Sequence, residues 1–174
     1  MRALGPGSIS SFLNVILGVV YAAMLLGVGL VTLLALAAIL FAVNPSLLAN
    51  VHFSGGEPFA ELAPVVIGGL LAAGAYMAGV LVIVGALRRI STTLTTGDPF
   101  HPDNVDRLRL IGVILAALEL GRYAVWALTA WLPAVRDVKP VFSLTAWFSV
   151  LVVFVLAEVF REGARLRREA ELTI

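Results

Sequence analysis

Four long apolar stretches, separated by polar connections, set the pattern of the chain. A hydrocarbon core about 30 Å thick requires about 20 apolar residues in a helix, so stretches of this length predict membrane spans. Prolines bound several of them, and a proline disfavours helix at the residue before it. The pattern predicts one all-α domain, an integral membrane four-helix bundle with helical extensions. The spans are expected at about 12–43, 64–87, 108–132 and 141–157.

Composition excludes a water-soluble domain. The chain is 60% hydrophobic and 13% charged, whereas soluble domains are usually about 45–50% apolar and about 25% charged. No charge interrupts the first stretch from Ala3 to Val43, which makes it too long for a cleaved signal segment of about 7–15 apolar residues. The absence of cysteine excludes disulfides, thiolate metal sites and a cysteine nucleophile.

The distribution of basic residues predicts how the chain is oriented in the membrane. Lys and Arg gather in cytoplasmic connections of membrane proteins. Loop 44–63 has neither, which predicts an outer loop, whereas Arg2, corner 88–107 with Arg109, and tail 158–174 hold nine basic residues together. The turn between the last two spans holds only Arg136 and Lys139. Both termini are therefore expected in the cytoplasm.

The residue pattern of the corner between the second and third spans predicts an ordered structure. Apolar residues at helical spacing predict that the second helix continues to Thr96, where Gly97 suits the helix cap. Asp98-Pro99 predicts a turn that leaves Phe100 to dock as an apolar anchor, and Pro102 suits the first position of a new helix. The corner is either an ordered connector or a docking surface for a cytoplasmic protein.

Two charged residues lie inside the third span. Glu119 and Arg122 are three residues apart, so they share a helix face and can pair toward the bundle interior. Such a pair is either a polar lock between helices or a functional group, since ionisable residues within a membrane are functional candidates. Tyr123 and Trp126 continue the same stripe. The second span is rich in small residues, which predicts close packing on more than one face, either within the monomer or in a homo-oligomer.

The tail is expected to continue the fourth helix with opposite charges at helical spacing. Its arginines would contact anionic lipid, while the neutral end Leu172-Thr173-Ile174 is expected to pack on something. We expect no enzyme, cofactor or metal. His52 and His101 fall on opposite sides of the membrane, and no phosphate-binding loop, zinc-protease or nucleophile-elbow pattern occurs.

Several residues of the corner and tail carry a family resemblance. They are Gly97-Asp98-Pro99-Phe100, Asn104, Arg107, Leu108 and Gly112, then Glu158, Phe160, Gly163, Glu169, Glu171 and Leu172. This set resembles a bacterial four-helix integral membrane family of unknown function, the DUF2975 domain family. The resemblance implies four spans in the bacterial inner membrane. Genes of that family often lie beside one for a small helix-turn-helix regulator, which implies a regulatory or scaffolding role. The family assigns no catalytic residues.

The corner and tail face the same side, so we expect them to pack into one surface, with Arg107 or Arg109 paired to Glu158 or Glu162. The expected partners are membrane lipids, a cytoplasmic protein and a second copy of the chain, with no direct contact to nucleic acid. The competing hypothesis is a small oligomeric transporter or channel that uses Glu119 and Arg122.

Overall fold

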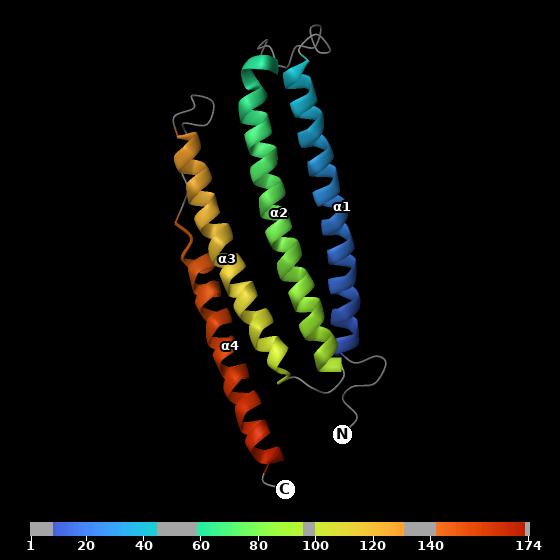
Figure 1. Cartoon of the computed structure of the whole chain (residues 1–174), viewed down its shortest axis with the longest axis vertical. Coiled ribbons are helices and arrows are strands. Elements are labelled where there is room, and N and C mark those ends of the chain that lie inside the picture. The colour runs from blue at the N-terminus through green and yellow to red at the C-terminus, as the bar shows by residue number, and fades with distance from the viewer. Residues whose placement is uncertain (1–8, 45–58, 96–99, 131–141, 173–174) are drawn as a thin grey trace.

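The computed structural model describes residues 9–44, 59–95, 100–130 and 142–172, and these form four helices (Figure 1). The helices are α1 (Ile9–Val43), α2 (Phe59–Thr95), α3 (Pro102–Thr129) and α4 (Leu144–Glu171). No strand occurs among the described residues. The predicted all-α four-helix fold is therefore confirmed.

All four helices are long and apolar enough to cross a membrane. The shortest have 28 residues, which at about 1.5 Å per residue exceeds a hydrocarbon core of about 30 Å. At most 17% of the residues in each apolar window are buried on the isolated chain. Such a surface is suited to lipid rather than to water.

Two helix starts differ from the sequence prediction. The second helix was expected to open at Pro64 but begins at Phe59, with Pro64 inside it. A proline near the start of a helix removes few internal hydrogen bonds, so the helix tolerates it. The fourth helix begins at Leu144 rather than near 141, because Ser143 caps it: its Oγ accepts a hydrogen bond of 3.2 Å from the Ala146 N–H.

Each helix packs mainly on its neighbours in sequence, so that α1 contacts α2, α2 contacts α3, and α3 contacts α4. The start of α1, the end of α2, the start of α3 and the end of α4 all lie at the same end of the molecule (Figure 1). A buried apolar cluster joins α2, α3 and α4 near this end. Its members are Ala86, Ile90, Leu108, Ile111 and Ala157.

Small residues give α2 two packing faces. A Cβ at Gly74 would meet Val31 of α1 at 3.6 Å, and Gly79 lies against Leu118 of α3. The predicted packing on more than one face is therefore confirmed within the monomer.

Candidate functional site at the corner and tail

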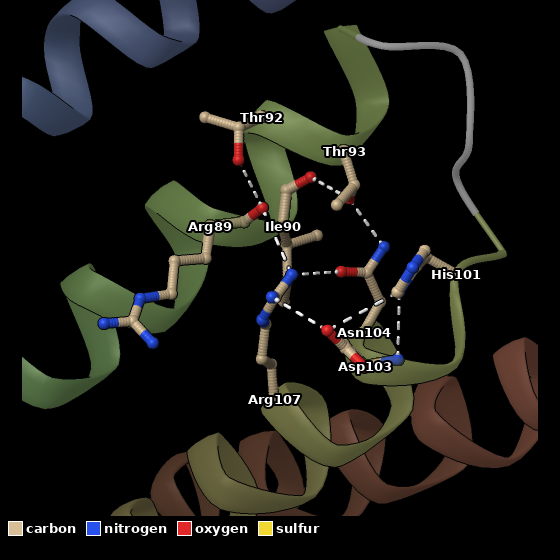
Figure 2. A network of polar contacts seen from close by, with 8 residues as sticks. All are labelled: Arg89, Ile90, Thr92, Thr93, His101, Asp103, Asn104 and Arg107. Carbon is tan, nitrogen blue, oxygen red and sulfur yellow. Dashed lines mark hydrogen bonds and ion pairs between the residues drawn. The ribbon is translucent and has the colours of Figure 1, made fainter.

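A buried asparagine joins α2 to α3 (Figure 2). Asn104 is 0% exposed. Its Nδ2 donates a 2.7 Å hydrogen bond to Thr93 Oγ1, near the end of α2, and its Oδ1 accepts one of 2.9 Å from Arg107 Nη1. Buried polar groups are costly unless they are hydrogen-bonded. Asn104 therefore favours one arrangement of the two helices, in which its bonds are made.

Arg107 extends this network. Its guanidinium also donates to the backbone oxygen of Arg89 at 3.4 Å and to the Asp103 carboxylate at 3.4 Å. The Thr92 and Thr93 hydroxyls donate at 2.7 Å to the carbonyl oxygens of Arg89 and Ile90. Both carbonyls lie within α2, four residues before the N–H groups of Thr93 and Leu94, so these side-chain contacts add to the helix's own hydrogen bonds.

The start of α3 has the predicted cap. His101 is the cap residue, and Pro102 follows in the first turn. His101 Nδ1 accepts the Asp103 N–H at 3.3 Å and lies 3.7 Å from the Asp103 carboxylate. Helix capping accounts for the placement of His101 and Asp103.

Phe100 anchors the corner on α4. Its ring lies 5.6 Å from that of Phe160, centroid to centroid, tilted by 52°. The ring also covers Gly163, where an added Cβ would lie 2.6 Å from a Phe100 carbon. Only glycine leaves room for the ring in this position. The corner and the tail therefore form one packed unit.

A second glycine extends this contact along α3. A Cβ at Gly112 would lie 3.0 Å from the Phe154 ring of α4, and Leu108 packs in the cluster with Ala157, which is 2% exposed. Residues that carry the family resemblance thus form contacts between helices. Gly97, Asp98 and Pro99 lie outside the described residues.

The ion pairs expected between corner and tail do not form among the described residues. Arg107 pairs with Asp103, while Glu158 pairs with Arg161 and Glu162 with Arg165. Each acid finds an arginine one helical turn away on its own helix. The contact between corner and tail is therefore apolar, and its charges remain at the surface.

A groove of about 620 Å³ lies between the start of α3 and the end of α4. Four arginines and three carboxylates line it, with apolar side chains among them. Leu172 at its edge is 84% exposed, so the prediction that this residue packs on something is not met within the described chain. The side chain of Glu171 lies outside the described part. The lining residues are Pro102, Val105, Asp106, Arg109, Arg161, Glu162, Ala164, Arg165, Arg168, Glu169 and Leu172.

The charged pair of the third span lies far from this groove. Glu119 is ten residues beyond Arg109, about 15 Å along the helix. It is 8% exposed and accepts hydrogen bonds from Arg122 Nη2 at 2.6 Å and from the Tyr123 hydroxyl at 2.9 Å. Both donors belong to α3. The hydrogen bonds that Glu119 accepts from described residues therefore lie within one helix.

A contact between α1 and α2 was not predicted from the sequence. The Arg88 guanidinium lies over the Tyr21 ring, 5.4 Å from its centroid, and so joins α2 to α1. The only signal was a single tyrosine in a long uncharged stretch, which does not identify a partner.

Four helices able to span a membrane, joined at one end by a packed corner and tail, define this chain as a multi-pass membrane protein. Residues 54–174 match the family model described as "Protein of unknown function (DUF2975)". The chain belongs to this family, as the resemblance predicted. No curated protein and no solved structure matches the chain.

Proposed function

We propose that this chain is a regulatory or scaffolding protein of the bacterial inner membrane that binds a cytoplasmic protein in the groove between corner and tail. The observation that carries this proposal is the fusion of the two segments into one surface through Phe100, Phe160 and Gly163. A surface assembled from segments about sixty residues apart in sequence holds its groups in fixed positions. Preorganised groups bind a partner at lower entropic cost.

The proposed orientation places both termini in the cytoplasm. The corner and tail lie at the end where the helices carry their arginines, and arginines mark the cytoplasmic side. The groove would then open toward cytoplasmic proteins, of which the small helix-turn-helix regulator implied by the family resemblance is one.

The chemistry of the groove favours an amphipathic segment with acidic residues. Arg109 and Arg168 line it, and neither has an ion-pair partner among the described residues. Ala164 and the exposed Leu172 add apolar surface beside them. Arginine and apolar side chains together are typical of protein interfaces. We propose a binding role for this groove and no catalysis.

Site-specific photo-crosslinking in living cells tests this function. A photoreactive residue at Arg109 or Leu172 is expected to capture the same cytoplasmic protein, whereas one at Ser149, near the other end of α4, should not. The Arg109→Glu and Arg168→Glu variants should reduce the yield severalfold, because they place carboxylates against an acidic segment. Crosslinks to lipid alone, or equal protein yields at Ser149, would contradict the proposal.

The alternative is a small oligomeric transporter or channel. One observation favours it: the Arg122 side chain is 40% exposed in the middle of α3, where a charge is costly in lipid. Flux through vesicles that contain the purified protein, lost in Glu119→Gln, would support transport. Absence of flux for protons, common ions and small metabolites would leave the binding role.

A further inference from the structure

A second hollow lies on the other side of the corner, between α1 and the end of α2. It consists of two adjoining parts of about 290 Å³ each, which share Tyr21, Gly85 and Arg89. Three arginines line the two parts, and no carboxylate does so within the described part of the chain. The remaining lining residues are Leu81, Val82, Ala86, Arg88, Thr92, Arg107 and Leu110.

Two of these arginines carry uncompensated charge. Arg107 pairs with Asp103, but neither Arg88 nor Arg89 has an ion-pair partner in the described ranges. The Arg88 guanidinium is held over Tyr21. The Arg89 side chain extends away from the network around Asn104 (Figure 2). Both arginines are exposed, so the hollow presents two adjacent positive charges that an anion can bridge.

The neighbouring helix indicates where this anion comes from. Beyond Tyr21, α1 continues toward the corner end for nine residues to Phe12, about 14 Å. Phe12, Val15 and Val19 are among its exposed apolar side chains, and α1 contains no charged residue. Exposed surface of this kind requires acyl chains around it. Acyl chains therefore border the hollow on the α1 side, so the anion can come from the lipid itself.

We propose that this hollow binds the phosphate group of an anionic phospholipid between Arg88 and Arg89. The planar guanidinium suits two-pronged hydrogen bonding to phosphate, and basic pockets between membrane helices are typical sites for such headgroups. Leu81 and Val82 line the hollow toward the membrane and would contact an acyl chain. The α3–α4 groove is a weaker site for this ligand, because three carboxylates line it. This site lies outside the proposed docking groove and does not depend on a protein partner.

The test is a titration of the purified full-length protein in neutral detergent with a short-chain phosphatidylglycerol, followed by native mass spectrometry. We expect one saturable site, with phosphatidylcholine and inorganic phosphate binding at least tenfold more weakly. Removal of both charges in R88Q/R89Q should weaken lipid binding about thirty-fold, at about fivefold per arginine. The matched control R165Q/R168Q removes two tail arginines that lie outside the hollow and contact lipid only through general surface charge, so it should change the affinity of this site less than twofold.

A second variant guards against misfolding or inverted insertion. R88K/R89K keeps the positive charge that orients the helices and loses the planar fork, so it should insert normally and bind the lipid severalfold more weakly. Equal losses in R88Q/R89Q and R165Q/R168Q would overturn the proposal, because general surface charge would then explain binding. Inorganic phosphate that binds as tightly as the lipid would also overturn it, since the site would then hold a free anion.

Discussion

The corner and the centre of α3 solve the same problem, a polar group among apolar residues, in opposite ways. At the corner, Asn104 bonds Thr93 on another helix, and the Phe100 ring crosses to Gly163 on a third. Within α3, Glu119 accepts hydrogen bonds from Arg122 and Tyr123 of the same helix. The first arrangement joins helices, whereas the second, among the described residues, satisfies the Glu119 carboxylate within one helix.

The corner residues therefore hold the helices together, whereas the residues around Glu119 balance charge locally. Substitutions at the corner should loosen the contacts between helices and thereby the proposed docking groove. Substitutions at Glu119 should leave the helix arrangement intact. Three predictions test the comparison, from the largest expected effect to the smallest.

Gly163→Ala should have the largest effect. The new Cβ would lie 2.6 Å from the Phe100 ring, so the ring must leave its position on α4. We expect a loss of about 3 kcal/mol in unfolding free energy, within the range for overpacked contacts. Unfolding in mixed micelles of detergent and SDS measures this change.

Gly121→Ala is the matched control, because a Cβ at Gly121 meets nothing within 4 Å. Alanine favours helix over glycine by about 1 kcal/mol, so this variant should be neutral or slightly more stable. If Gly163→Ala proved as stable as Gly121→Ala, the conclusion that Phe100 anchors the corner on α4 would be wrong.

Asn104→Ala should have the next largest effect. The Thr93 hydroxyl and the Arg107 guanidinium would each lose their hydrogen bond to Asn104. This loss should lower the unfolding free energy by about 2 kcal/mol. Faster hydrogen exchange near the end of α2 and the start of α3 would report it. Asn44→Ala is the control, since the exposed Asn44 side chain donates to the Leu40 carbonyl one turn back and, among the described residues, makes no bond to another helix. Similar exchange in both variants would contradict the joining role of Asn104.

Glu119→Gln should have the smallest effect on the arrangement of helices. Glutamine keeps the shape and an acceptor for the Tyr123 hydroxyl. Distances between spin labels on α3 and α4 should therefore match those of the unmodified protein. A shift of several ångströms would show that Glu119 does join helices, and the comparison would fail.

The sequence predicted the elements better than the contacts. The first span was expected to end at residue 43, and α1 ends at Val43. Pro102 was expected at the first position of a new helix, and α3 begins there. These signals are local, because caps and prolines act within one turn. The start of α2 was placed too late since a proline near a helix start was treated as its boundary.

Contacts between distant residues were harder to predict. Phe100 was expected to dock, but nothing near it in the sequence indicates Gly163 as its seat. Arg107 was expected to reach the tail, yet Asp103 lies one turn away and forms the pair at a lower entropic cost. The Arg88–Tyr21 contact depends on the register between α1 and α2, which apolar periodicity does not determine.

The packing of each helix on its predecessor also has a consequence for biogenesis. Domains of a growing chain fold from the N-terminus as they emerge, and contacts between sequence neighbours form quickly. The first hairpin can assemble before the second is synthesised. The contact between Phe100 and Gly163, by contrast, can form only after Gly163 has been translated. The proposed docking groove is therefore completed only after α4 has been synthesised, and chains truncated before α4 would not display it.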